Sequence, residues 1–251
     1  MSESRVPIPA SQERANTAGA GRAGAADPLP LRVAVLASGR GSNLQALLDA
    51  QHNDACRFRI AGVFSDRAQA QALERARAAN VPAVALKPSD YATREAFDAA
   101  LFDAIDAVHP DLVVCAGYLR VLTDQAVQRY AGRIINIHPS LLPRFLGLRT
   151  HAQALIAGAS EHGASVHYVI PALDAGPVIA QARIGVLADD TAASLAARVL
   201  EREHPLLLRC VEWIATGRIF QKGSDVVVDS RCLSQPLLLG DDDQLTEPVD
   251  A

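Results

Sequence analysis

The chain has 251 residues, a mass of 26.6 kDa and a hydrophobic fraction of 49%, all ordinary values for a soluble globular protein. A domain of this mass can bury roughly 70–75% of the surface of its extended chain, so neither metal nor disulfides are needed to stabilise it. The formal charge of -4 comes without a basic block and gives no electrostatic argument for a nucleic-acid partner or an anionic membrane.

Residues 1–30 are rich in Ala, Gly, Ser and Pro and contain no apolar run long enough for a secretory signal or a membrane helix. We predict a disordered extension. An organelle transit segment is the alternative, and the acidic residues Glu3, Glu13 and Asp27 argue against it. The four cysteines form no C-x-x-C pair, which argues against a metal cluster or a disulfide framework and favours a cytoplasmic location.

From Leu31 onward, strands and helices alternate. Residues 31–37 are an almost continuous apolar run, typical of a strand buried on both faces of a parallel sheet. A Gly-rich turn and leucines at helical spacing follow. Further strands are predicted at residues 58–64, 83–86, 112–116 and 133–138, and helices at about 68–79, 93–108 and 124–130. This repeat predicts an α/β fold with a doubly wound, mostly parallel sheet.

After residue 143 the pattern changes. Residues 164–170 and 178–186 are two predicted strands, and their connection, rich in Pro, Asp and Gly, favours an antiparallel ribbon at one edge of the sheet. A long helix follows, from a cap at Asp190 or Thr191 to Trp213, and Pro205 either kinks it or begins a second segment.

The region beyond Phe220 is less regular. Residues 226–228 are a candidate edge strand, and residues from 240 onward are predicted to form a frayed acidic tail. We therefore divide the chain into an extension at 1–30, a main domain at 31–220 and a C-terminal tail at 221–251.

The turn that contains Gly41, Ser42 and Asn43 is a candidate phosphate site. A strand, a Gly-rich turn and a helix place backbone N–H groups and a Ser hydroxyl at a helix N-terminus, where the partial positive charge favours an anion. Leu44 stands where a dinucleotide-binding turn would carry Gly or Ala. Asp66, near the end of the second strand, keeps a nicotinamide cofactor open, and a turn without any ligand is the other alternative.

Asn136 and His138 are two residues apart on a predicted strand, so their side chains share one face near its carboxyl end, where open α/β sheets bind ligands. An amide and an imidazolium can stabilise an oxyanion, and the imidazolium can protonate a leaving amine. A buried, structurally satisfied His is the alternative. Asp174 lies in a turn where local hydrogen bonds would explain it, but a ribbon folded over the strand end would bring it to His138 and favour the protonated ring.

Four motifs in this order resemble those of the phosphoribosylglycinamide formyltransferases, a family of folate-dependent enzymes of purine synthesis. They are the segments ASGRGSNLQAL (37–47), IINIHPSLLP (134–143), EHGASVH (161–167) and LDAGPVI (173–179), and the similarity covers about residues 31–220. The chain departs from the family between Arg144 and Arg149, a loop in which Arg149 replaces a residue that is often acidic or His.

The resemblance implies a Rossmann-like formyltransferase fold and formyl transfer from 10-formyltetrahydrofolate to the glycyl amine of glycinamide ribonucleotide. It implies a catalytic trio, a ribonucleotide site, a folate site that shares one residue with the trio, and no metal. The implied residues are, in that order, Asn136, His138 and Asp174; Gly41, Ser42, Asn43 and Glu203; and Arg94, Leu119, Arg120, Val121, Leu122 and Asn136.

Other interpretations remain open at this point. A related enzyme that uses water, a nucleotide sugar or initiator aminoacyl-tRNA as the acceptor would keep the trio. The deformylase usually carries an extra domain before the catalytic one and the tRNA enzyme a basic domain after it, and neither fits the segments outside residues 31–220. A nicotinamide-dependent dehydrogenase and a non-catalytic binding protein are the remaining two. We expect small-molecule partners only, and a monomer or a homodimer.

Overall fold

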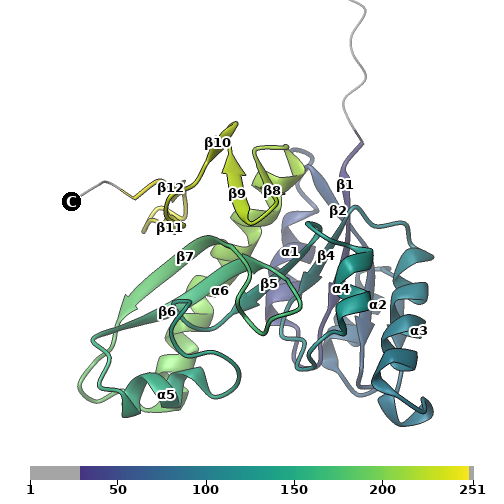
Figure 1. Ribbon diagram of the computed structural model, residues 1–251, viewed down its shortest axis with the longest axis horizontal. Helices are drawn as coiled ribbons and strands as arrows, with labels where there is room; N and C mark the ends of the chain where they lie inside the picture. The colour runs from purple at the N-terminus through teal and green to yellow at the C-terminus, as the bar shows by residue number, and fades with distance from the viewer. Residues whose placement is uncertain (1–28, 249–251) are drawn as a thin grey trace, which may run out of the picture.

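The computed structural model describes residues 29–248 (Figure 1). The predicted extension at 1–30 therefore lies almost entirely outside the described residues. Within them, nine strands form one sheet in the order β12-β11-β7-β6-β5-β4-β1-β2-β3, and β8, β9 and β10 form a smaller antiparallel sheet.

The bounds of the elements are as follows. The helices are α1 Ser42–Ala50, α2 Gln71–Ala78, α3 Arg94–Asp106, α4 Asp124–Arg129, α5 Thr150–Ile156 and α6 Ala192–Ala215, with a short 3₁₀ turn at Pro88–Asp90. The strands are β1 Leu31–Leu36, β2 Phe58–Ser65, β3 Ala83–Ala85, β4 Leu112–Cys115, β5 Ile134–His138, β6 Glu161–Tyr168, β7 Val178–Gly185, β8 Ile219–Lys222, β9 Asp225–Val228, β10 Arg231–Cys232, β11 Leu237–Leu239 and β12 Leu245–Thr246.

The central strands are buried on both faces, which explains their continuous apolar runs. Val33 and Val35 of β1 pack in a core with α1, α2 and α6, whereas Ala34 and Leu36 pack in a second core with α3 and α4. The sheet is therefore the middle layer of a three-layer sandwich, with helices on each side (Figure 1). This arrangement confirms the predicted doubly wound α/β class.

The strand order reverses beside β1. The chain passes from β1 outward to β2 and β3 and then returns to β4 on the other side of β1. The chain leaves the carboxyl ends of β1 and β4 in opposite directions. In open parallel sheets, a crevice that can bind a ligand forms outside the carboxyl ends of two such neighbouring strands. The Gly-rich turn after β1 and the loop after β4 both lie at this crevice.

The antiparallel ribbon of β6 and β7 is present as expected, and β6 also runs antiparallel to β5. The strand begins at Glu161, three residues before the predicted start, because Glu161, His162 and Gly163 pair with β7. β7 is itself parallel to β11, so the mixed part of the sheet is wider than an edge strand.

The long helix α6 begins after Thr191, one of the two predicted caps. The Thr191 hydroxyl accepts a hydrogen bond from the Ser194 N–H, and the Ser194 hydroxyl accepts one from the Thr191 N–H. These reciprocal bonds satisfy donors that the first helical turn leaves without partners. Pro205 lies inside the helix, which continues past it to Ala215.

The C-terminal region differs from the expected edge strand and frayed tail. Residues 226–228 are in β9, but β9 belongs to the small separate sheet rather than to the edge of the main one. Beyond Gly240 the chain forms β12, and Asp243 is paired with Arg202 at 2.9 Å while its carbonyl accepts a hydrogen bond from Arg209. Asp243 therefore anchors this region to α6 through its carboxylate and its backbone carbonyl, an effect that local composition does not reveal.

The helix α5 was also absent from the sequence-based prediction, because only seven residues form it and no side chain within the described residues caps its start. No helix between residues 29 and 248 is long and apolar enough to cross a membrane.

The close pairing of β6 and β7 gives a stability prediction. A Cβ atom added at Gly163 would lie 1.9 Å from the carbonyl oxygen of Ala182 on β7. We expect Gly163→Ala to lower the free energy of unfolding by about 1–3 kcal/mol, the usual cost of overpacking. Gly185→Ala on the same ribbon meets nothing within 4 Å and is the matched control. Equal midpoints of urea unfolding for the two variants would mean that the approach of β7 does not restrict position 163.

Candidate active site

A cavity of about 800 Å³ opens at the crevice beside β1, β4 and β5. Its walls come from the start of α1, the loop after β4, the end of β5, the loop before α5, the β6–β7 connection and α6. The predicted site residues among its lining are Asn43, Leu119, Arg120, Val121, Leu122, Asn136, His138, Asp174 and Glu203. Segments far apart in the sequence therefore meet in one concave site.

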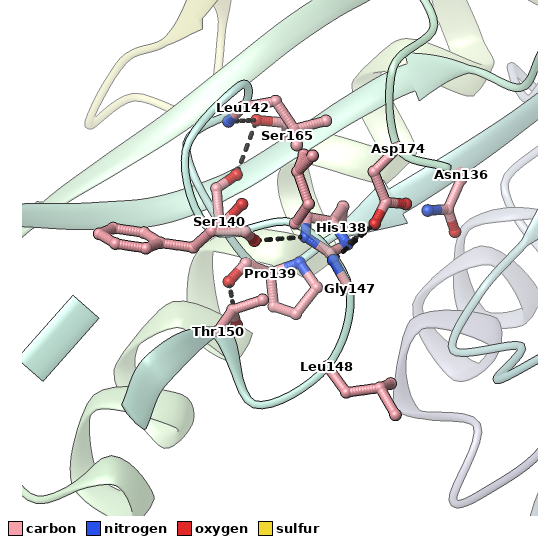
Figure 2. A network of polar contacts seen from close by, with 12 residues as sticks. Asn136, His138, Pro139, Ser140, Leu142, Gly147, Leu148, Thr150, Ser165 and Asp174 are labelled. Atoms are coloured by element: carbon pink, nitrogen blue, oxygen red, sulfur yellow. Dashed lines mark hydrogen bonds and ion pairs between the residues drawn. The ribbon is translucent and has the colours of Figure 1, made fainter. Parts of the chain in front are cut away.

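His138, at the carboxyl end of β5, is 5% exposed and lies between two acceptors (Figure 2). Its Nε2 is 3.0 Å from the Phe145 carbonyl oxygen, and its Nδ1 is 3.6 Å from Oδ2 of Asp174. Because a carbonyl oxygen only accepts hydrogen bonds, the Nε2 of His138 is the donor in the first contact, and the Asp174 carboxylate lies next to Nδ1. The ribbon thus brings Asp174 to His138, as expected from the sequence.

Asp174 is held in place by backbone contacts. Its Oδ2 accepts a hydrogen bond of 2.9 Å from the N–H of Gly147, and its backbone has a φ of 48°, a left-handed conformation. A non-glycine residue at such a φ is uncommon and concentrates at functional sites. The loop before α5 therefore contacts both members of the pair, through the Phe145 carbonyl and the Gly147 N–H.

A second set of hydrogen bonds fixes the segment that follows His138 (Figure 2). The Ser165 hydroxyl donates to the Ser140 carbonyl at 2.7 Å and accepts from the Leu142 N–H at 3.0 Å, while the Thr150 hydroxyl donates to the Pro139 carbonyl at 2.6 Å. These bonds tie β6 and α5 to the end of β5. They support the position of the His138 ring against the loop.

Asn136 lies two residues before His138 and directly opposite His167 in the β5–β6 register. Its Nδ2 is 3.1 Å from Nε2 of His167, whose Nδ1 donates to the Tyr168 carbonyl at 2.9 Å. His167 is 2% exposed, and burial lowers its pKa. The ring is therefore a neutral acceptor for the Asn136 amide.

The turn after β1 has the conformation that its glycines predict. Gly41 has a φ of 71°, and an added Cβ would lie 2.7 Å from the Cβ of Ala72. No side chain among the described residues caps the N-terminus of α1, so its first N–H groups are available to a ligand. Of the three residues of the predicted phosphate site, Asn43 is among the lining residues of the cavity, and Gly41 and Ser42 are not.

Asn43 and Glu203, both in the lining of the cavity, join α1 to α6. The Asn43 Nδ2 donates to Oε2 of Glu203 at 2.7 Å, and both residues are less than 10% exposed. Burial raises the pKa of the Glu203 carboxyl, and the Asn43 hydrogen bond partly offsets the increase. Within the described part of the chain, Oδ1 of Asn43 is buried without a partner.

The loop after β4 also lines the cavity and includes the exposed side chains of Leu119 and Val121. The Leu119 N–H donates to the Ser38 hydroxyl, which donates to Asp66 at 2.6 Å. Asp66 is 8% exposed and lies outside the cavity lining, so its carboxylate supports this loop instead of facing a cofactor ribose. The nicotinamide cofactor that the sequence left open therefore has no support from Asp66, the residue on which that alternative was based.

Arg94 is the first residue of α3, is exposed, and is not brought to the cavity lining. The opposite case is that of three residues that contact the trio although the sequence analysis assigned them no role, namely His167, Phe145 and Gly147. Of these, only His167 could have been found from the sequence, because it is the last residue of the motif EHGASVH (161–167). The other two act through backbone atoms, which carry no residue-type signal.

Taken together, the cavity offers an amide donor and an imidazole beside a carboxylate, and the uncapped N-terminus of α1 directly precedes its lining residue Asn43. These groups suit attack on a carbonyl, stabilisation of the oxyanion and proton transfer to a leaving group. Over residues 29–248, no three His, Cys, Asp or Glu side chains gather in a way that could hold a metal ion.

Comparisons with known proteins agree with this chemistry. The formyl transferase family matches residues 31–211. The phosphoribosylglycinamide formyltransferase of Escherichia coli (strain K12) is 47% identical over 189 residues, which cover 75% of this chain and 89% of that protein. The structure of the phosphoribosylglycinamide formyltransferase from Coxiella burnetii in complex with CHES is 42% identical with a TM-score of 0.78, over 82% of this chain and 96% of that one.

A formyltetrahydrofolate deformylase from Pseudomonas syringae pv. tomato is similar as well, with 30% identity and a TM-score of 0.72. The match covers 79% of this chain but only 66% of the deformylase chain. The similarity to the phosphoribosylglycinamide formyltransferases extends over nearly their full length, so the chain is more similar to them.

The buried Glu203 gives a second stability prediction. Its pKa is raised in the folded state, so ionisation of this carboxyl weakens the fold as the pH rises above the unfolded value of 4.5. We expect Glu203→Gln to raise the free energy of unfolding at pH 7.5 by about 0.5–2 kcal/mol. The gain should vanish below pH ~4, where both states are protonated. Thermal unfolding at the two pH values tests this, and a gain that is equal at both would contradict it.

Proposed function

The chain belongs to the formyl transferase family, and from this premise we propose that Asn136, His138 and Asp174 carry out its reaction. The activity is that of a phosphoribosylglycinamide formyltransferase, which transfers a formyl group from 10-formyltetrahydrofolate to the glycyl amine of glycinamide ribonucleotide in purine biosynthesis. One observation carries the assignment of the trio: His138 lies 3.6 Å from the Asp174 carboxylate and shares a cavity with the Asn136 amide.

The ribonucleotide binds, in this proposal, between the N-terminus of α1 and α6. The backbone of Gly41 and Ser42 and the Ser42 hydroxyl would hold the phosphate, because helix N-termini attract anions. Glu203, oriented by Asn43 at 2.7 Å, would accept hydrogen bonds from sugar hydroxyls. The Glu203 carboxyl is buried, lies in the cavity lining and offers acceptor oxygens, which supports a ligand with hydroxyl donors.

The folate would occupy the other side of the cavity. Its flat ring system fits the apolar wall formed by Leu119, Val121, Leu122 and Leu148, with the Arg120 backbone in the same loop and Asn136 near the formyl group. Arg94 is proposed as a folate contact on the resemblance alone, since the structure leaves it outside the cavity lining.

The proposed mechanism is direct transfer. The neutral glycyl amine attacks the formyl carbon and gives a tetrahedral oxyanion, to which Asn136 Nδ2–H and protonated His138 donate hydrogen bonds. The C–N bond to the folate then breaks, its electron pair stays on the folate nitrogen, and His138 or a site water protonates that nitrogen. The newly formylated nitrogen gives up its extra proton, which restores the proton donor. Asp174 stabilises the imidazolium. The Nε2–H of His138, which here donates to the Phe145 carbonyl, is the group that would turn to the substrate.

The remaining proposals concern the setting of the enzyme. We propose that it works in the cytoplasm on small molecules, without nucleic acid or membrane, as a monomer or a homodimer. The free state of Cys56, Cys115, Cys210 and Cys232 supports a reducing compartment. We also propose residues 31–220 as the catalytic unit, which the family match at 31–211 supports.

Replacement of the trio tests the mechanism. We expect His138→Ala and Asp174→Ala each to lower kcat by about 10²–10³-fold, because each removes a group that acts on the transition state. Affinity for glycinamide ribonucleotide, measured by calorimetry, should change little. His52→Ala, at an exposed turn, is the control and should keep normal turnover. Near-normal kcat for either site variant would overturn the assignment.

The pH dependence follows from the same roles. The proposed reaction needs a proton donor and, at the same time, a neutral attacking amine, and these two requirements oppose each other as the pH changes. We therefore expect kcat/KM to pass through a maximum when it is measured between about pH 5 and 10. A profile that stays flat into the alkaline range would contradict the proton-donor role of His138.

A further inference from the structure

The other two members of the catalytic trio do not set the orientation of the Asn136 side-chain amide. The amide must present N–H, not its carbonyl oxygen, to a developing oxyanion, because an oxygen there would repel the negative charge. Rotation about χ2 of Asn exchanges the two ends, and this torsion has a broad, roughly two-fold profile. The orientation must therefore be set by a hydrogen-bond partner. Within the described residues, the Asn136 side chain has one such partner, the imidazole of His167.

The tautomer of His167 decides which end of the amide faces it. The carbonyl oxygen of Tyr168 lies 2.9 Å from Nδ1 and can only accept, so Nδ1 carries the proton. In the neutral ring Nε2 is then a lone-pair acceptor, 3.1 Å from Asn136 Nδ2. An acceptor at this position selects the N–H end of the amide and rejects the oxygen end.

The surroundings keep His167 neutral. The residue is 2% exposed, and burial lowers its pKa, as does the nearby charge of His138. Asp174, with Oδ1 at 3.8 Å from Nε2, and the Tyr168 carbonyl act in the opposite direction. A proton on Nε2 would turn the ring from an acceptor into a donor toward Asp174 and remove the bond that orients Asn136.

We propose that His167 is a positioning residue for formyl transfer, and that its Nε2 lone pair orients the Asn136 amide so that an N–H faces the developing oxyanion. The relay runs from the Tyr168 carbonyl through the His167 ring to Asn136 across the β5–β6 register. This inference rests on the proposed function of Asn136. It adds a residue that does not itself touch the substrate.

Two substitutions distinguish the role of the His167 Nε2 from that of its Nδ1. The Gln amide oxygen in His167→Gln can reach the position of Nε2 and accept from Asn136. The shorter Asn amide in His167→Asn reaches only the position of Nδ1 and can donate to Tyr168 alone. We expect H167N to lower kcat about 10–100-fold, less than the loss of the donor itself, with KM for both substrates near the wild-type value. H167Q should restore most of this loss.

A double-mutant cycle distinguishes orientation from general support of the fold. If His167 acts through Asn136, then adding H167N to Asn136→Ala should change kcat by less than about threefold. The same loss of about 10–100-fold in both backgrounds would overturn the proposal, as would equal kcat values for H167N and H167Q.

A measurement on the protein without substrates tests the contact between His167 and Asn136 independently of the proposed reaction. ¹⁵N NMR of imidazole-labelled wild-type protein should show His167 as the Nδ1–H tautomer with a hydrogen-bonded Nε2, and the Nε2 signal should shift in Asn136→Ala. An Nε2–H tautomer or a doubly protonated ring would refute the relay, whatever the turnover. If the tautomer is as expected but the wild-type protein transfers no formyl group, the proposed function fails and the orienting contact stands.

Discussion

The antiparallel pairing of β5 with β6 is the constraint on which the site depends. Side chains alternate between the faces of a strand, so a slip of one residue would carry Asn136 and His138 to the opposite face of the sheet. The observed register sets Asn136 against His167 and His138 against Ser165, while Ile135 and Ile137 are buried in the helix-covered core on the other side. Burial of those apolar side chains provides free energy that holds the polar ones in position. The precision of the site therefore depends on packing well outside it.

The loop between residues 143 and 150 is a second constraint on the positions of His138 and Asp174. Phe145 and Arg149 have φ values of 56° and 59°, and Asp174 has 48°, so three non-glycine residues around His138 adopt the left-handed conformation. Each such residue costs of order 1–3 kcal/mol. The loop compensates through the contacts of the Phe145 carbonyl with His138 and of the Gly147 N–H with Asp174. Glu203 on α6 is a comparable case, because burial raises the pKa of its carboxyl and the hydrogen bond from Asn43 partly offsets this effect.

Much of this architecture could be predicted from the sequence because it depends on local patterns. Continuous apolar runs identified the buried strands, and the capping residues Asp190 and Thr191 marked the start of α6 to within one residue. The i, i+2 spacing identified Asn136 and His138 as neighbours. The C-terminal strands could not be predicted, because they depend on the pairing of β11 with β7 and on arginines of α6, which are long-range contacts. The roles of Phe145 and Gly147 were also inaccessible, since these residues act through the backbone.

The cavity at the carboxyl ends of β1, β4 and β5 is where a formyl group would pass from the folate to the amine of glycinamide ribonucleotide. The most direct measurement follows the absorbance of the deformylated folate when purified protein is mixed with 10-formyltetrahydrofolate, with and without the ribonucleotide. We expect product only when the ribonucleotide is present, with one formylated ribonucleotide for each folate released. Equal release without the ribonucleotide would mean that water is the acceptor and would contradict the transferase assignment.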